Sequence, residues 1–571
     1  MEHLELRDRQ GWAEALFGRS TLPDKRLKSR VMCYASAQMG APAGSTAAVC
    51  ETSAEREGAY RLLENRRVRA EDILEGPVQH CVERCLRLRR VLAIQDSSSV
   101  SVKDSELRES LKESGSATGF QTHTTLAVDP ERGAPLGILD HMHWIREPEV
   151  LRRKARRERA QDSTAAGSTR DKESARWQAT AARVHKRFTD LGAGGAGVEV
   201  VTVADREADI YELLADHTER GQGYVIRAKH ARQVEAQDPS LGDIYAAVAA
   251  APVLARRDVA VMQRGGQKAV AGQRARAARP AATVPTEVRA CRITVKRPAS
   301  CARGLRADIE LSVVEVRTTG SAGPAVSAGS ATATATEQAG DAAEAKPPVP
   351  SLHWVLLCSA PIETEADALQ AVRDYECRWL IEELFKAWKT GCRLEERPFH
   401  TSEAVQRMMA LLLPIAVLML ELRALKDLGP EATTAKRGQA EGKGKAKANA
   451  TKAASDPAAG PDASVLLETD QWQCLWLHTE RGKALPKHPP SCRWAYFAIA
   501  KLGGRVRLQT HWARRLGHHV ARMVQTRRLR HRISPRFAAK TRRGRDVITS
   551  QALKAKRDED CWVINTCLRE G

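Results

Sequence analysis

The sequence has no pair of cysteines at C-x2-C spacing, the arrangement typical of zinc fingers and thiol redox motifs. Its thirteen cysteines are scattered singly, and Cys81 and Cys85, one helical turn apart, come closest to a pair. An odd number of isolated cysteines argues against a disulfide framework. It favours free thiols in a reducing cytoplasm.

The sequence also lacks an apolar run long enough to cross a bilayer, which needs about 20 residues. The longest run, residues 408–420, contains Pro414 and follows Thr401, Ser402 and Glu403, which are typical of a helix start. We therefore expect a buried helix here. Residues 1–10 are charged throughout, so we expect no signal peptide, no membrane partner and a cytoplasmic location.

Positively charged residues outnumber negatively charged ones, 91 Lys and Arg against 70 Asp and Glu. The formal net charge is +21, which favours a polyanionic partner such as nucleic acid. Residues 505–571 hold 18 Lys/Arg against 5 Asp/Glu and so carry +13 of this total. The basic character is therefore largely a property of the last part of the chain.

Apolar residues recur at helical spacing through residues 1–75, and cations are frequent between them. Two interpretations stay open for this region: a solvated helical face, or a small helical domain that reads DNA.

From about residue 76 the pattern changes to short β-branched runs and helices, which predicts an α/β core. Two of the runs, 90–95 and 198–204, are each followed by an acid, Asp96 and Asp205. Acids at the ends of neighbouring strands lie at the rim of a sheet, where ligands bind in α/β folds. Further strands are expected at 122–128, 137–144, 224–229, 256–262, 288–295, 309–317 and 352–359, and helices at 78–89, 172–188, 206–214 and 491–502.

Four polar residues recur on one predicted helix: Tyr375, Arg378, Glu382 and Lys389. Offsets of three, four and seven place them on one face of a single α-helix. A carboxylate can hold a divalent metal ion, and cations with a phenol can bind a phosphate backbone. The face therefore indicates phosphodiester chemistry on a nucleic acid.

Asp96, Asp205 and Glu382 together would suit a site for two Mg²⁺ ions about 4 Å apart, able to assist an in-line displacement. Each acid alone has another interpretation. Asp96 could cap a turn, Asp205 could cap a helix at Arg206, and the neighbours Glu207, Asp209 and Glu383 compete for the same roles. The pairs His141-x-His143 and His518-His519 are weaker metal candidates because no finger-spaced partners accompany them.

Several short sequence motifs resemble those of the bacterial cut-and-paste DDE transposases of the insertion-sequence-four family. They run in order from about residue 12 to residue 504 and are, besides the 375–389 motif, Asp205-Arg206-Glu207-Ala208-Asp209-Ile210, Lys386-Ala387-Trp388-Lys389-Thr390-Gly391, Glu57-Gly58-Ala59-Tyr60-Arg61, Arg227-x-Lys229-His230 and Trp494-Ala495-Tyr496.

The resemblance implies a ribonuclease-H-like α/β catalytic core with an inserted β-rich subdomain, a helical N-terminal DNA-binding domain and a helical C-terminal region. It implies that Asp96, Asp205 and Glu382 bind two Mg²⁺ ions, for which Mn²⁺ can substitute. The implied DNA contacts are Tyr375, Arg378 and Lys389 on phosphates, Trp354 on a flipped base, Arg227 and Lys229 at a strand end, and Arg26, Arg30 and Arg61 in end recognition.

The implied partners are double-stranded DNA, both terminal inverted repeats and target, and a second copy of the chain in the synaptic complex if the C-terminus is competent. The expected location is the bacterial cytoplasm, at the nucleoid. The expected layout is end recognition over 1–75, core over 76–230, β-rich insertion over 231–350 with 318–350 disordered, core with the glutamate helix over 351–428, a low-complexity linker over 429–464, a helical region over 465–504 and a basic, disordered tail over 505–571.

The leading interpretation is a transposase that nicks its element ends, forms hairpins and joins the ends to target DNA. One alternative is a transposition-defective relative that binds DNA and acts as an inhibitor. A general nuclease of the same fold is disfavoured by the predicted end-recognition region and by Trp354.

The resemblance stops at Gly504, and the family's Trp-rich dimerisation helix is missing after it. Residues 505–524, back-translated with permitted codons and read one base later, give Gly-Phe-Asp-Ser-Lys-Arg-Thr-Gly and a Trp-rich continuation typical of the family. We therefore hypothesise that a frameshift near codon 505 replaced the native C-terminus and produced the basic tail.

Sequencing the gene across codon 505 tests this hypothesis. We expect codons that read in the shifted frame as the family segment, because codon choice is the only freedom in the back-translation. Codons incompatible with that frame would show the tail to be native.

Overall fold

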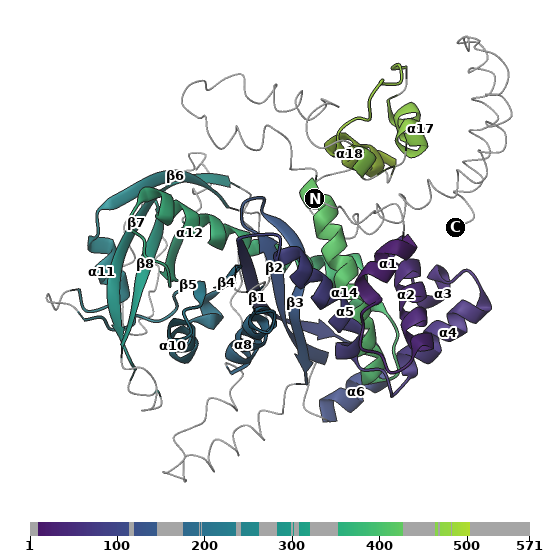
Figure 1. Cartoon of the computed structure of the whole chain (residues 1–571), viewed down its shortest axis with the longest axis horizontal. Helices are drawn as coiled ribbons and strands as arrows, with labels where there is room; N and C mark the ends of the chain where they lie inside the picture. Colours follow the sequence, from purple (N-terminus) through teal and green to yellow (C-terminus); the bar gives the residue numbers. More distant parts are fainter. Residues whose placement is uncertain are drawn as a thin grey trace, which may run out of the picture. The chain divides into compact units, whose positions relative to one another are not determined.

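A nine-stranded mixed sheet runs through the described part of the chain (Figure 1). The computed structural model describes residues 9–113, 119–145, 175–192, 195, 197–235, 241–261, 282–298, 301, 308–319, 352–425, 463–465, 467, 469–480 and 482–502. The segments expected to be disordered or to be linkers, 318–350, 429–464 and 505–571, lie outside the described residues apart from 318, 319, 463 and 464.

The strands are ordered β3-β2-β1-β4-β5-β9-β8-β7-β6 across the sheet. β1, β4 and β5 are parallel to one another, and every other neighbouring pair is antiparallel. The bounds are β1 (Arg90–Ser101), β2 (Gly119–Asp129), β3 (Ala134–Trp144), β4 (Glu199–Ala204), β5 (Gly223–Arg227), β6 (Val253–Val261), β7 (Ala282–Lys296), β8 (Asp308–Thr318) and β9 (His353–Cys358).

The strands expected in a β-rich insertion continue this same sheet. β9 pairs antiparallel with β5, and β8, β7 and β6 follow in turn. The edge of the parallel core is thereby covered by paired strands, which satisfies its backbone N–H and C=O groups. It also brings residues around 354 close to the end of β5.

The N-terminal part is helical, with α1 (Arg9–Phe17), α2 (Lys25–Gly40), α3 (Thr46–Val49), α4 (Ser53–Glu64) and α5 (Ala70–Cys85). Local capping explains where they begin. Asp24 accepts the N–H of Arg26 at the start of α2, and Thr52 forms a capping box with Glu55 at the start of α4. Such caps satisfy N–H groups that have no partner within the helix.

The other helices are α6 (Ser105–Glu113), α8 (Ala175–Thr189), η2 (Arg206–Ala208), α10 (Tyr211–Glu219), α11 (Ile244–Ala250), α12 (Glu365–Cys377), α13 (Trp379–Lys386), η4 (Ala387–Gly391), η5 (Leu394–Glu396), α14 (Ser402–Leu425), η6 (Ala463–Val465), α17 (Thr469–Thr479) and α18 (Cys492–Leu502). The single helix expected at 206–214 is wrong. A short 3-10 turn ends at Ala208, and α10 begins only at Tyr211.

β1 separates two packed layers because successive side chains point to opposite faces of a strand. Val91 and Ala93 pack with α5 and α8 in one buried cluster. Leu92 and Ile94 are also buried and, by the same alternation, point to the other face. Asp96 shares their parity and therefore lies on the face opposite α5 and α8.

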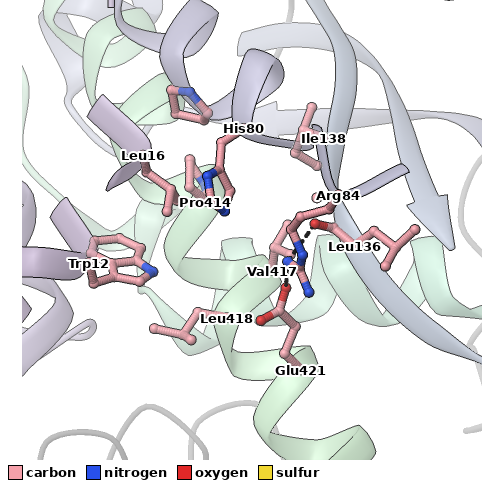
Figure 2. A pocket seen from close by; sticks show the side chains of 12 residues that line it. Trp12, Leu16, His80, Arg84, Leu136, Ile138, Pro414, Val417, Leu418 and Glu421 are labelled. Atoms are coloured by element: carbon pink, nitrogen blue, oxygen red, sulfur yellow. Dashed lines mark hydrogen bonds and ion pairs between the residues drawn. The ribbon is translucent and has the colours of Figure 1, made fainter. Parts of the chain in front are cut away.

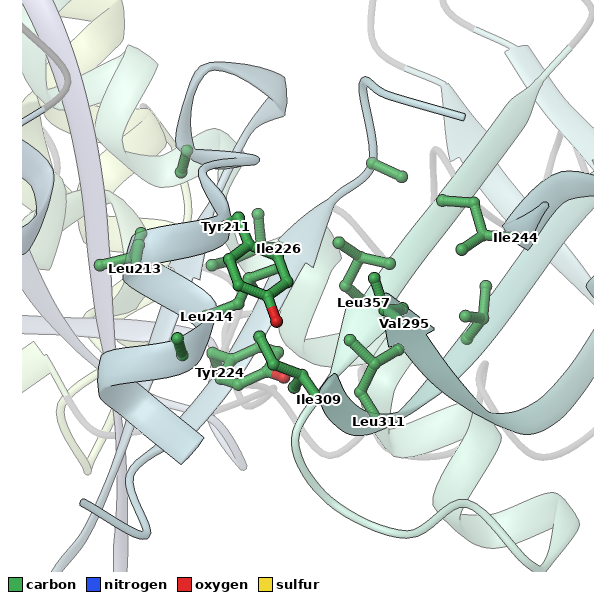
Figure 3. Packing of buried hydrophobic residues seen from close by; sticks show 14 of the residues in the cluster. Tyr211, Leu213, Leu214, Tyr224, Ile226, Ile244, Val295, Ile309, Leu311 and Leu357 are labelled. Atoms are coloured by element: carbon green, nitrogen blue, oxygen red, sulfur yellow. The ribbon is translucent and has the colours of Figure 1, made fainter. Parts of the chain in front are cut away.

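A second cluster holds the extended half of the sheet against α10 and α11. Figure 3 shows side chains of α10 directed at those of the neighbouring strands. Its members include Trp177 from α8, Tyr211 and Leu214 from α10, Tyr224 and Ile226 from β5, Leu311 from β8 and Leu357 from β9.

The long apolar helix expected after Thr401 is α14, and the hydroxyl of Thr401 accepts the N–H of Ala404 at its start. By length and composition alone residues Ser402–Ala424 could span a membrane, but 89% of the most apolar window is buried inside the fold. This is the environment of a core helix, as predicted.

α14 also lines a hollow together with α1, α5 and β3 (Figure 2). Its wall is apolar except for a few polar groups, of which Arg84 and Glu421 form an ion pair. Arg84 also donates to the carbonyl of Leu136 at 2.6 Å. Burial raises the pKa of Glu421, and the guanidinium of Arg84 opposes that rise.

Two buried arginines join the N-terminal helices to the rest of the fold. Arg397 donates to the carbonyls of Pro42 and Cys392, at 2.8 and 3.0 Å, and to the side chain of Gln38. Arg407 of α14 donates to the carbonyls of Leu63 and Val68 at 2.6 and 2.5 Å. Part of the basic composition therefore serves structure and is not exposed to a partner.

We expect Arg397→Met to lower the free energy of unfolding by about 1–3 kcal/mol, since it leaves buried acceptors without a donor. Urea denaturation followed by circular dichroism measures the effect. Arg220→Met is the matched control, because Arg220 pairs with Asp216 on the surface and should change stability by less than about 0.5 kcal/mol. Equal midpoints for the two variants would contradict the prediction.

Candidate active site

The parallel pairing of β1 and β4 brings Asp96 and Asp205 together. The last paired residues are Ile94 and Val203. Two residues further along each strand, the same register places Asp96 opposite Asp205. The expectation that the first strand ends at Asp96 is wrong, because β1 continues to Ser101 by pairing with β2 alone. The side chain of Asp96 thus projects where the two parallel strands part.

The carboxylate of Asp96 is mostly buried. One oxygen accepts the N–H of Ser97 at 2.8 Å, and the other faces the guanidinium of Arg378 at 3.5 Å. Burial raises the pKa of Asp96 to about 7. The negative charges of Asp205 and Glu382 add to that rise, and Arg378 opposes it. The three predicted acids are therefore close enough for the charges of Asp205 and Glu382 to affect Asp96.

Asp205 follows the end of β4 and accepts the N–H of Glu207 at 2.8 Å, so it also caps the 3-10 turn. Its neighbour Asp209 is buried and accepts from Arg232 and from the backbone N–H groups of Lys229 and His230. Both carboxylate oxygens of Asp209 accept hydrogen bonds in this network, so Asp209 does not compete with Asp205 for the site.

The segment 375–389 is not the single α-helix that was expected. α12 ends at Cys377 and α13 begins at Trp379, with i→i+3 hydrogen bonds on either side of Arg378. From Ala387 the chain widens into a π-turn, closed by the N–H of Cys392 on the carbonyl of Ala387 at 2.8 Å. Such turns are frequent at functional sites because they redirect a side chain.

Arg378 stands at the junction of α12 and α13 and forms ion pairs with both Asp96 and Glu382. Burial lowers its pKa, but Tyr375, Glu382 and Asp96 outweigh burial and hold the pKa of Arg378 above its ordinary value. Glu383, in contrast, is buried and pairs with Arg423 of α14. Glu382 is therefore the member of this adjacent pair that acts on Asp96.

Lys389 lies in the π-turn and reaches back to β1. Its ammonium donates to the hydroxyl of Ser98 at 2.7 Å and to the carbonyl of Ser99 at 3.0 Å. Burial lowers the pKa of Lys389, and the carboxylates of Glu395 and Asp96 oppose that shift. The sequence interpretation missed Ser98 because it ended the strand at Asp96 and left open a turn after it. The period-two alternation from Leu92 would have placed Ser98 on the same face as Asp96.

Trp354 on β9 is half-buried and meets the ring of Tyr375 edge-on, with 5.0 Å between ring centroids. Arg227 at the end of β5 donates to the carbonyl of His353 at 2.9 Å and also bonds the side chain of Tyr375. Burial lowers the pKa of Arg227. Trp354, Arg227 and Tyr375 therefore form one group that continues into Arg378.

Other predicted contacts lie elsewhere. The side chain of Lys229 is exposed beyond β5. Arg26 and Arg30 are exposed on α2, and Arg61 is exposed on α4, where it pairs with Glu57. α2 and α4 pack closely, since a Cβ at Gly58 would lie 3.3 Å from Arg30 Nε. These three arginines therefore belong to one helical pair, separate from the acids.

The rival histidine pair is structural where the structure describes it. The Nδ1 atom of His141 bonds the hydroxyl of Thr124 at 2.9 Å, and its ring meets Trp388 edge-on. Burial lowers the pKa of His141 to about 3. His518 and His519 lie outside the described residues.

Within the described residues, no three His, Cys, Asp or Glu side chains are grouped closely enough to hold a metal ion together. The chemistry of the acids nevertheless suits one. Carboxylate oxygens are the ligands that Mg²⁺ and Mn²⁺ prefer. Asp96 and Glu382 share the guanidinium of Arg378, so this one cation compensates the two carboxylates only in part. Asp96, Asp205 and Glu382 are thus the residues that fit a divalent cation.

Two known protein families match parts of the chain. Residues 164–420 match the transposase DDE domain, and residues 9–68 match the transposase DNA-binding domain. The first match contains Asp205, Glu382 and the 375–389 segment, and the second contains Arg26, Arg30 and Arg61. Asp96 lies between the two matches and joins the site through the pairing of β1 with β4.

A DDE domain implies a ribonuclease-H-like core, and enzymes that carry it depend in general on divalent metal ions. The DNA-binding domain makes DNA the partner of the chain. The chain is therefore a DDE transposase, an enzyme that cleaves DNA and catalyses strand transfer.

Proposed function

We propose that this transposase moves an insertion sequence by a cut-and-paste route, and that it belongs to the insertion-sequence-four family and acts like the transposase of transposon five. The observation that carries the proposal is the shared environment of three acids, in which Asp205 and Glu382 raise the pKa of Asp96 and Arg378 lies between Asp96 and Glu382. Sequence motifs of the family surround Asp205, Arg378 and Glu382.

In the proposed route, each element end is first nicked to free a 3′-hydroxyl. That hydroxyl attacks the opposite strand and forms a hairpin, which is reopened before the end joins target DNA. Every step is an in-line phosphoryl transfer, so a single set of carboxylates can serve all of them.

Asp96, Asp205 and Glu382 would hold two Mg²⁺ ions, with Mn²⁺ as a substitute. Bound there, the ions would activate the attacking oxygen and stabilise the leaving oxygen. Arg378 forms ion pairs with both Asp96 and Glu382 in the structure. Its cation would turn to a DNA phosphate when these carboxylates take up metal, so the site remains charge-compensated in both states.

Tyr375, Arg378 and Lys389 would contact phosphates of the cleaved strand. Trp354, half-exposed beside Tyr375, would stack on a base flipped out of the duplex, which relieves the sharp bend of a hairpin. Arg227, which belongs to this group at the end of β5, and Lys229, exposed beyond that strand, would contact the backbone.

Arg26, Arg30 and Arg61 would bind the terminal inverted repeats from the exposed surface of α2 and α4. The partners would be element ends, target DNA and a second copy of the chain, the last if the C-terminus is competent. The enzyme would act at the nucleoid in the cytoplasm.

We expect Asp96→Ala, Asp205→Ala or Glu382→Ala to abolish cleavage but to spare end binding, because each removes a metal ligand and leaves α1–α4 unchanged. The assay incubates a duplex carrying the repeats that flank the gene with Mg²⁺ and separates nicked, hairpin and bound species on gels. Glu207→Gln is the control, since Glu207 is exposed two residues from Asp205.

Full cleavage by any of the three alanine variants would count decisively against the assignment. Binding without nicking by the unaltered protein would instead favour the transposition-defective inhibitor, and indiscriminate digestion of plasmid DNA would favour a general nuclease.

We expect Trp354→Ala to slow hairpin formation while first-strand nicking continues, because loss of base stacking costs about 1–3 kcal/mol only where a base is flipped. Product ratios over time measure both steps. Trp354→Phe should recover part of the hairpin rate. An equal loss in both steps would show that Trp354 supports the fold instead.

A further inference from the structure

The hydroxyl of Ser98 is the strongest unexplained polar group near the acids. It accepts from the ammonium of Lys389 at 2.7 Å. Ser98 lies two residues beyond Asp96 on the part of β1 that pairs with β2 alone, opposite Thr122. The hydroxyl of Thr122 donates to the carbonyl of Ser98 at 2.9 Å, which fixes the backbone of Ser98.

Lys389 needs such a support because the π-turn removes it from a regular helix. Its neighbour Trp388 is fully buried and donates to the carbonyl of Met409 on α14 at 3.2 Å. That bond anchors the turn from one side. The contact with β1 holds the other side, since Lys389 Nζ also donates to the carbonyl of Ser99 at 3.0 Å. A long flexible side chain is thereby confined to one position.

The ammonium of a lysine has three N–H donors. The contacts with Ser98 and Ser99 use two of them, which leaves one that can meet a phosphate oxygen. Asp96 and Ser98 lie on one face of β1, so this donor is held on the side of the sheet that carries the acids.

We propose that Ser98 is a positioning residue, whose hydroxyl holds the Lys389 ammonium beside Asp96 for a phosphate of the cleaved DNA strand. The inference rests on the proposed function, in which Lys389 contacts that phosphate. Ser98 itself touches neither DNA nor the reacting atoms.

The experiment measures single-turnover nicking in Mg²⁺ of a duplex that carries the repeats flanking the gene, with end binding followed by gel shift. We expect Ser98→Ala to slow nicking about tenfold, the usual effect of losing a hydrogen bond to a charged group. Ser98→Thr keeps the hydroxyl and should restore the rate to within about threefold.

Ser101→Ala is the matched control, because Ser101 is exposed on the same strand and its side chain is not part of the proposal. We expect it to nick like the unaltered enzyme. A double variant with Ser98→Ala and Lys389→Ala should be no slower than Lys389→Ala alone, because the hydroxyl acts only through the ammonium.

Each contrary result has one meaning. If Lys389→Ala nicks normally, the proposed phosphate contact fails. If Lys389→Ala is slow but Ser98→Ala matches Ser101→Ala, or if the two losses multiply in the double variant, the positioning role of Ser98 is overturned. Failure of Ser98→Thr to recover the rate would also overturn it.

Discussion

The register between β1 and β4 is the constraint on which the rest of the site depends. Two parallel strands whose pairing ends at Ile94 and Val203 place Asp96 and Asp205 next to each other at the point where they part. Burial raises the pKa of Asp96 to about 7, and repulsion from the neighbouring carboxylates adds to that rise. Such an arrangement is stable only with a cation nearby, and Arg378 supplies one in the structure.

The groups around the acids come from elements that are distant in the chain, and irregular backbone aims them. The break at Arg378 lets one guanidinium reach Asp96 and Glu382, and the π-turn lets Lys389 reach Ser98. The antiparallel strands β6–β9 extend the core sheet and carry Trp354 to Tyr375. The sheet thus supports a site in which Arg378 and Lys389 are placed by irregular backbone, at the α12–α13 junction and in the π-turn.

Much of this could be predicted from local pattern. The β-branched runs before Asp96 and Asp205 form strands, and the apolar run after Thr401 forms a buried helix. The errors share one cause. Secondary-structure propensity considers each segment alone and does not include contacts with distant parts of the chain. Pairing with β2 extends β1 to Ser101. A hydrogen bond from Trp388 to α14 accompanies the π-turn.

By itself the sequence determined the types of element, the candidate acids and the family words, because these depend on residues near one another in the chain. Only the tertiary structure decided between neighbouring candidates. Asp209 is excluded as a site residue because it forms a buried ion pair with Arg232, and Glu383 is excluded because it pairs with Arg423. Asp205 and Glu382 are left as the acids that act on Asp96. The reason is physical: which of two adjacent carboxylates meets a site depends on the partners that the folded chain brings to each, and those partners lie far away in sequence.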